Sequence, residues 1–283
     1  MRIPQTLCRA VPSLRLSAPV ASGATRTIRQ FHSTRPARKS HNPRWLSDVK
    51  ARLKRCQDLD IAPERMKKSK ELFAYIQSHW LELLAGEEGY LTAKEWRGLD
   101  NHQVTWGDMV SPVQFPTVDE TPHWLRHVNN VVYNKYAEAA RVNFLRSFVA
   151  TSDPEHRQEW IELMTPRSVG LILRSIRTDY KFPMDFPDRT TVLHKLVSPP
   201  NYDSDHVLLE AVIMSERHQR PAARCFEDIV VFNYKTAQKT PLKGFMVDKL
   251  RETYQLQEAS KKACEDEVEG IIKAVEEIEA SAA

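Results

Sequence analysis

The sequence has no long uncharged apolar stretch. A membrane-spanning helix needs about 18–20 consecutive, mostly apolar residues, whereas the longest apolar runs of this 283-residue chain, such as residues 169–173, have only the length of a strand. We therefore expect a soluble mature protein that does not insert stably into a membrane. The chain is long enough for one large domain or two small ones, and no internal repeat or low-complexity tract divides it.

Cysteine is scarce as well. The four cysteines are far apart in the sequence, and no two of them form a CxxC pair or stand at the spacing of metal ligands. We therefore expect free thiols in a reducing compartment, no metal site and no cofactor. Cys225 could be a nucleophile, but a small, partly buried strand residue is the more common role for such a cysteine. The other three are Cys8, Cys56 and Cys264.

Acidic residues are absent from the first 44 positions, which carry eight arginines and one lysine. Positive charge without acid, together with many Ser and Thr residues, is typical of an organelle transit peptide. Such a segment can form an amphipathic helix that binds anionic lipid and follows an inside-negative potential. The stretch 29–34 is similar to a two-step mitochondrial processing site, which implies one cleavage after Gln30 and a second near Lys39.

The net charge of +4 arises entirely from this segment. Of the 41 basic residues, 32 lie outside it and are opposed by 37 acidic residues, a net charge of −5. A basic arm that touches nucleic acid is the alternative, but the arm has no lysine cluster and stops where the first acid, Asp48, appears. We therefore predict a presequence at 1–44, a mitochondrial matrix location and no nucleic-acid partner.

The part 45–102 is expected to hold a linker and an N-terminal helix. Residues 45–62 are polar and predict a linker or a short helix. Pro63 then opens an amphipathic helix whose apolar residues recur at three- and four-residue steps until Gly86. The apolar stripe of this helix, within 72–84, must pack on the domain or on a second subunit.

The last part, 241–283, is acidic and helical from Gly244 onward. Its apolar residues are compatible with one face of a helix. A coiled-coil or partner-binding role is one option. A helix that packs on its own domain, with a solvated acidic side, is the more common outcome.

The central part, 103–240, alternates between strand and helix patterns. A short strand is expected at 103–109 and a helix at 129–148, where apolar residues fall on one stripe. Strand-like runs punctuated by prolines follow at 168–182, 190–198, 206–215 and 222–234. One strand, one helix and four strands in this order indicate an α+β fold in which an antiparallel sheet wraps around a central helix.

The segment Arg126–Arg141, RHVNNVVYNKYAEAAR, carries the most specific signal. It resembles the GHVNNxxYxxYxExAR signature of the thioesterase superfamily typified by 4-hydroxybenzoyl-CoA thioesterases and plant acyl-carrier-protein thioesterases. The stretch 171–192 resembles the second strand, the Y-x-x-P kink and the next turn of that family, so the resemblance covers 104–234. It implies a hotdog fold with extra N- and C-terminal helices, acyl-CoA or acyl-carrier protein as partner, and a homodimer or dimer of dimers.

Thioester hydrolysis needs a base that activates water and donors aimed at the developing oxyanion. Backbone N–H groups at a helix N-terminus are such donors, and Asn129 or Asn130 is a natural cap where the predicted helix begins. With Tyr133, these asparagines are the expected substrate-binding residues. His127 is either a site residue or a buried structural histidine. Glu138 is either a general base or a buried carboxylate anchored to a donor, and we favour the second.

The resemblance fails where the family carries its catalytic acid. In the family, an Asp usually stands four residues before the His, in a D-x-D-x-x-G-H context. Here His123 stands at that position and Arg126 replaces the Gly. The first half of the motif occurs earlier, at 105–109, and is followed by an insert, 111–125.

The identity of the base therefore has three candidate answers. Asp108 is the first, because it keeps its strand context and reaches the helix start if the insert loops out. Asp119 or Glu120, within the insert, could replace it. The acid could also be lost, which would leave an acyl-binding or scaffold module in a mitochondrial assembly. We predict the acyl-thioester hydrolase, and we expect Arg141 to pair with a carboxylate rather than with a CoA phosphate.

Overall fold

A computed structural model of the chain describes residues 41–58, 62–109 and 127–280. All of them belong to one compact unit, His41–Ala283. The expected cleavage sites near the N-terminus and the insert 111–125 lie outside the described residues.

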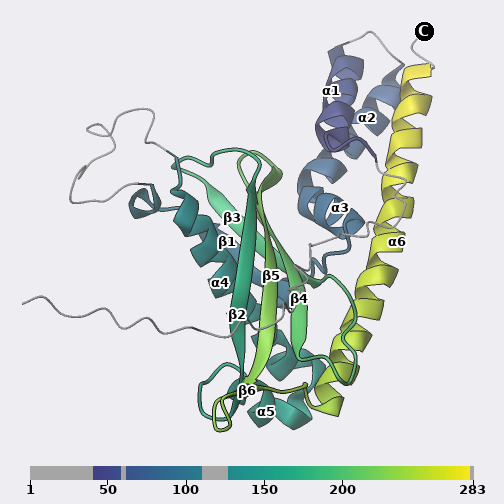
Figure 1. The fold of residues 1–283 in the computed structure, drawn as a ribbon. Coiled ribbons are helices and arrows are strands. Elements are labelled where there is room, and N and C mark those ends of the chain that lie inside the picture. The colour runs from purple at the N-terminus through teal and green to yellow at the C-terminus, as the bar shows by residue number, and fades with distance from the viewer. Residues whose placement is uncertain (1–40, 59–61, 110–126, 281–283) are drawn as a thin grey trace, which may run out of the picture. The chain divides into compact units, whose positions relative to one another are not determined.

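One antiparallel sheet organises the described chain, with five strands in the order β1-β3-β4-β5-β2 and a short β6 paired to β5 (Figure 1). The strands are β1 (Arg97–Gln103), β2 (Val169–Tyr180), β3 (Arg189–Leu196), β4 (His206–Ser215), β5 (Arg220–Asn233) and β6 (Gln238–Lys239). The four strand runs expected after the central helix are confirmed, with ends that differ by no more than two residues. Strands β1 and β2 form the two edges of the sheet.

The strand expected at 103–109 is not formed, and that prediction is wrong. The first strand lies earlier, at Arg97–Gln103, and pairs with β3 with two register shifts. Residues Trp106–Asp108 instead form a short 3-10 helix, η2. The cause is a capping box, in which Thr105 and Asp108 each satisfy a backbone N–H of the other. This local pairing outweighs the strand-like alternation of apolar residues in the segment.

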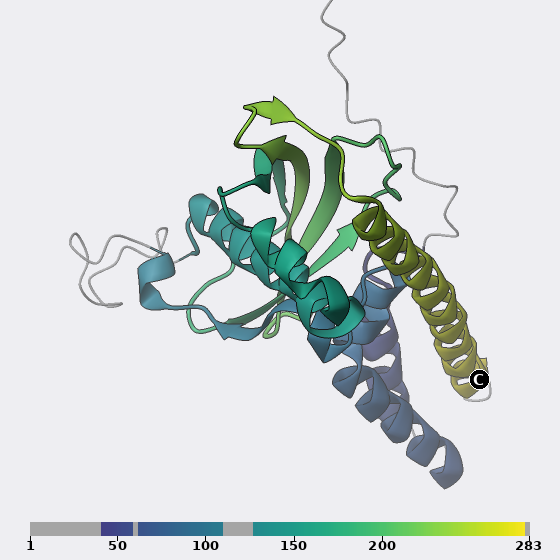
Figure 2. The ribbon, with the colours of Figure 1, turned by 90° about the horizontal axis from the view of Figure 1, so that it is seen from below.

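The central helix α4 (Asn130–Ser147) lies where the sequence predicts it and packs mainly on β1 and β3. The sheet curves around α4 (Figure 2), as the hotdog fold requires. Close packing depends on Gly98 in β1, because a Cβ atom there would lie 2.4 Å from the carbonyl oxygen of Ala140. The buried residues of α4 recur at steps of one, three and four: Tyr133, Tyr136, Ala137, Ala140, Phe144 and Ser147.

On the opposite face of the sheet, α6 (Gly244–Ala280) packs on β3, and α1 (Trp45–Asp58), α2 (Pro63–Ser78) and α3 (Trp80–Glu87) pack against α6 (Figures 1 and 2). Neighbouring strand residues alternate between the two faces. In β3, Val192 packs with α4, whereas Leu193 packs with the terminal helices. The expected helix from Pro63 is thus divided in two at His79, and its apolar stripe packs on its own domain rather than on a second subunit.

The C-terminal helix α6 is attached to the end of β3 through one buried side chain. The amide of Gln257 accepts a hydrogen bond from Leu196 N at 3.0 Å and donates one to Leu196 O at 3.1 Å. Buried apolar residues along α6 confirm that this helix packs on its own domain. Among the helices that the structure describes, none is both long enough and apolar enough to cross a membrane.

A charge network joins the sheet to the end of α3. Arg224 in β5 binds Glu88 and, at 2.9 Å, Glu210 in β4. Lys195 in β3 donates to Glu88 O at 2.6 Å and lies 4.4 Å from the centre of the Tyr90 ring. These ion pairs are largely shielded from solvent, and they hold the end of α3 in place against β3, β4 and β5.

Candidate active site at the N-terminus of α4

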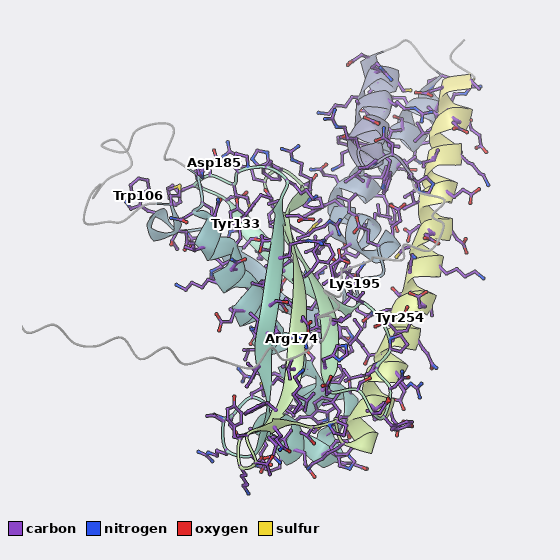
Figure 3. All side chains as sticks on the ribbon, viewed as in Figure 1. Trp106, Tyr133, Arg174, Asp185, Lys195 and Tyr254 are labelled. Atoms are coloured by element: carbon purple, nitrogen blue, oxygen red, sulfur yellow. The ribbon has the colours of Figure 1, made fainter. Side chains whose placement is uncertain are left out.

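Segments from four parts of the chain meet at the N-terminus of α4. The backbone amide of Asn129 donates to Asp108 O at 2.8 Å, and Val128 N donates to Met184 O at 2.7 Å. His127 forms a β-bridge with Asp185. Figure 3 shows Trp106, Tyr133 and Asp185 together at this end of the domain.

The helix begins with the cap that the sequence predicts, and the capping residue is Asn129. Its side-chain oxygen accepts from Val131 N at 3.2 Å, and its carbonyl accepts from Val132 N at 2.9 Å. Among the described residues, no acceptor is bonded to Asn130 N. This exposed amide points out of the positive end of the helix dipole and can stabilise an anion. The hydroxyl of Tyr180 in β2 holds the Asn130 carbonyl at 3.0 Å.

Asp108 lies beside this helix end, because the chain on either side of the insert comes back to the same place. Its carboxylate is half-buried. One oxygen, Oδ2, accepts from Thr105 N at 2.6 Å and from Thr105 Oγ1 at 2.8 Å. Within the described part of the chain, no donor is bonded to Oδ1, which leaves it available to a water molecule. The other candidate bases, Asp119 and Glu120, lie outside the described residues.

Sequence reasoning missed Tyr136, which lies next to Asp108. Its side chain is only 4% exposed, and its hydroxyl has no hydrogen-bond partner among the described residues. Burial and then the charge of Asp108 raise the pKa of Tyr136. The signal was available, since Tyr136 follows Asn129 by seven residues, close to two helical turns, and so lies on the same side of α4.

Tyr133, an expected substrate-binding residue, is buried and its hydroxyl is already used. It accepts a hydrogen bond from Met184 N at 2.9 Å, and its ring meets that of Tyr180 edge to face at 5.4 Å. Tyr133 therefore holds the loop between β2 and β3, at Met184, against α4, and it supports the site without being open to a substrate.

His127 and Glu138 both differ from the expected environments. His127 is exposed, with Nδ1 3.2 Å from Val128 O, so the interpretation as a buried structural histidine is wrong. Glu138 is also exposed, so the interpretation as a buried, anchored carboxylate is wrong. It follows Asn129 by nine residues, or about two and a half helical turns. Glu138 thus lies on the side of α4 opposite to Asn129, whereas His127 remains next to the helix start.

Two other residues are placed by the structure outside the site. Arg141 binds the buried carboxylate of Glu227 at 2.7 Å, which confirms the expected pairing with a carboxylate. Cys225 is buried, and burial raises the pKa of its thiol to about 11. A thiol of this kind is a poor nucleophile near neutral pH. Across the described ranges, no three His, Cys, Asp or Glu side chains are grouped in a way that could hold a metal ion.

The thioesterase-like superfamily model matches residues 104–250, just over half of the chain. The chain belongs to this superfamily. Membership accounts for the hotdog fold and supports thioester hydrolase activity in general. No match was found among curated protein sequences.

Solved structures with similar folds come from several bacteria. A thioesterase from Thermus thermophilus, complexed with coenzyme A and Zn, is 18% identical, with 57% of this chain and 98% of that chain covered and a TM-score of 0.39. The PA5185 protein from Pseudomonas aeruginosa is 17% identical, with 60% and 94% covered and a TM-score of 0.40. The DHNA-CoA thioesterase from Staphylococcus aureus is 13% identical, with 57% and 90% covered and a TM-score of 0.38.

Proposed function

We propose that this thioesterase-like protein hydrolyses acyl thioesters, with Asp108 as the general base and the N-terminus of α4 as the oxyanion site. The observation that carries the proposal is the 2.8 Å hydrogen bond from Asn129 N to Asp108 O. It joins the turn that bears the carboxylate to the helix end that bears the free amide. A base and an oxyanion donor therefore lie next to each other, as thioester hydrolysis requires.

The reaction follows from these two groups. The open oxygen of Asp108 takes a proton from water, and the resulting hydroxide attacks the thioester carbonyl carbon. Asn130 N–H stabilises the oxyanion that forms, in a direction that the helix dipole favours. The tetrahedral intermediate then expels the thiolate, which takes up the proton from Asp108. The products are a carboxylic acid and a thiol.

The substrates we propose are acyl-CoA or acyl groups on acyl-carrier protein, both of which carry phosphate. Support comes from exposed cations at this end of the domain. Arg217 lies in the turn between β4 and β5, 3.3 Å from Asp185, which is the bridge partner of His127. Arg189 and Arg217 also line a hollow of about 410 Å³, together with Asp188 and Glu216. Exposed arginines are well suited to bind phosphate groups.

The location we propose is the mitochondrial matrix, on the basis of the acid-free, arginine-rich segment 1–44. If it is a presequence, the mature protein begins between Phe31 and Lys39. Mass spectrometry of the protein's N-terminus from isolated mitochondria checks this expectation. An intact Met1 in the matrix form would contradict it.

The alternative of a scaffold module relied on the terminal helices as surfaces for partners. Their apolar faces are instead buried within the same chain, against one another and against the sheet, so no observation in the described residues favours that role over catalysis. The test is direct. The purified full chain is incubated with acetyl-, octanoyl- and palmitoyl-CoA and with an acyl-carrier-protein thioester, and the free thiol is followed with a thiol reagent. Release of thiol from at least one substrate is expected, and a well-folded protein inactive on all of them would overturn the proposal.

A further inference from the structure

Tyr136 is a buried tyrosine whose hydroxyl has no hydrogen-bond partner among the described residues. Burying a hydroxyl without a partner destabilises a fold, and phenylalanine would fill the same space without that cost. The stability of the fold therefore gives no reason for a tyrosine rather than a phenylalanine at this position. The hydroxyl lies at the candidate site, beside the base.

The groups that face Tyr136 come from several elements, and most of them are already engaged. Tyr133, from α4 itself, accepts from a backbone amide. His102 in β1 presents its ring to the Tyr136 ring edge to face, with centroids 5.6 Å apart. The two remaining groups are the carboxylates of Asp188 and Asp108.

Both oxygens of Asp188 already accept hydrogen bonds. One of its oxygens accepts from Ser215 Oγ at 2.6 Å, and the other accepts from Arg189 N at 2.7 Å and Arg217 N at 3.0 Å. Asp108 is different, because both donors of Thr105 bind the same oxygen, Oδ2. Its Oδ1 accepts from no donor within the described residues, and Asp108 lies near enough for its charge to act on the Tyr136 hydroxyl.

We propose that Tyr136 is a positioning residue for Asp108, whose hydroxyl donates to Oδ1 and holds the carboxylate toward the attacking water. This inference rests on the proposed hydrolase activity. Thr105 fixes one oxygen of the base and Tyr136 the other, so the carboxylate is held from two sides. A carboxylate oxygen has two lone pairs, and Oδ1 can accept from Tyr136 and from the water at the same time.

The test compares Tyr136→Phe with a matched control, Tyr90→Phe, in the full chain. Tyr90 is also buried with an unpartnered hydroxyl, but it lies near Lys195 on the other face of the sheet. For Tyr136→Phe we expect kcat on the best acyl-CoA to fall about tenfold or more, the effect of one hydrogen bond to a charged group. KM should stay close to wild type. The Tm should stay close to that of wild type, because the hydrogen bond lost to Asp108 is offset by the removal of a buried polar hydroxyl.

Each other outcome decides the question. Unchanged kcat in Tyr136→Phe, or equal losses in Tyr90→Phe, overturn the inference while the proposed function stands. A clearly lower Tm shows a structural role and overturns it as well. If the wild type turns over no thioester, the proposed function fails, and a crystal structure of the wild type decides the inference. A Tyr136 Oη to Asp108 Oδ1 distance of about 2.5–3.0 Å supports it, and another partner for the hydroxyl refutes it.

Discussion

The carbonyl of Asp108 and the amide of Asn129 are joined by a 2.8 Å hydrogen bond, although the insert separates the two residues in the sequence. This bond attaches the turn η2 to the start of α4. It also explains how a chain that has lost the family's usual acid position can keep a carboxylate at the helix N-terminus.

Replacement of Asp108 by Asn is expected to remove the base and leave the turn intact. The amide oxygen of Asn can still accept from Thr105, so the capping box and the Tm should be preserved. Turnover should fall by roughly 10²–10⁴, the usual contribution of a general base. Steady-state thiol release measures the effect, and Asp203→Asn, at an exposed loop position, is the control. Activity that survives in Asp108→Asn but disappears in an Asp119 or Glu120 variant would place the base in the insert.

The sequence predicted the parts of the site that depend on local chemistry. The asparagine cap of α4 follows from the residue type and from the apolar stripe behind it, and the four later strands follow from alternation. The exposure of Glu138 could also have been predicted, since helical geometry places it opposite to the apolar stripe of α4. The family signature drew attention to Glu138 instead.

The parts that the sequence did not predict depend on contacts between distant segments. The approach of Tyr136 to Asp108 spans the insert, and no periodicity encodes it. Strand β1, RGLDNHQ, has a single large apolar residue, and its register shifts against β3 break any regular alternation. Strand β1 forms because it pairs with β3. The apolar residues that follow it led instead to the prediction of a strand at 103–109.

Removing only one member of the buried ion pair between Arg141 and Glu227 should destabilise the fold more than removing both charges. The side chains are 12% and 0% exposed. Arg141→Met leaves the buried Glu227 carboxylate, among the described residues, with only the His194 ring beside it, whose Nε2 lies 3.4 Å from Oε2. The free energy of unfolding should fall by about 3–5 kcal/mol. The double variant Arg141→Met, Glu227→Gln removes the buried charge and should recover most of the loss. Urea denaturation measures both. A loss under about 1 kcal/mol in the single variant would show that Glu227 finds another partner.

Low pH should lower the stability of the protein by protonating Glu210, whose ion pairs link β4 to β3 and β5. Burial alone acts to raise the pKa of Glu210, but Lys195 and Arg224 outweigh it, so the pKa lies below its ordinary value. Because the folded value is the lower one, this stabilisation is present above the unfolded pKa, about 4.3, and is lost as the pH falls through the folded pKa. The Tm should therefore fall in that window. Glu210→Gln should flatten this part of the Tm–pH curve, whereas Glu258→Gln, at an exposed position on α6, should leave it unchanged.

Strand β2 should be the surface through which two copies of the chain associate. It is a twelve-residue edge strand that pairs only with β5 within the described residues, and Leu173 and Tyr180 on it are 37% and 44% exposed. Long uncovered edge strands with apolar side chains are templates for pairing. The opposite sheet face is covered by the protein's own helices, so we expect a homodimer rather than a dimer of dimers.

A charge on this strand tests the expectation. Leu173→Glu places two like charges at the pairing edge and should convert the dimer to monomer in light scattering at micromolar concentration. Leu256→Glu is the matched control, because Leu256 on α6 is 50% exposed and lies away from the edge strand. It should leave the dimer intact. A wild type that is monomeric under these conditions, or a Leu173→Glu variant that remains dimeric, would contradict association through β2. Since the site lies beside Tyr180 at the end of this strand, loss of the dimer should also lower thiol release.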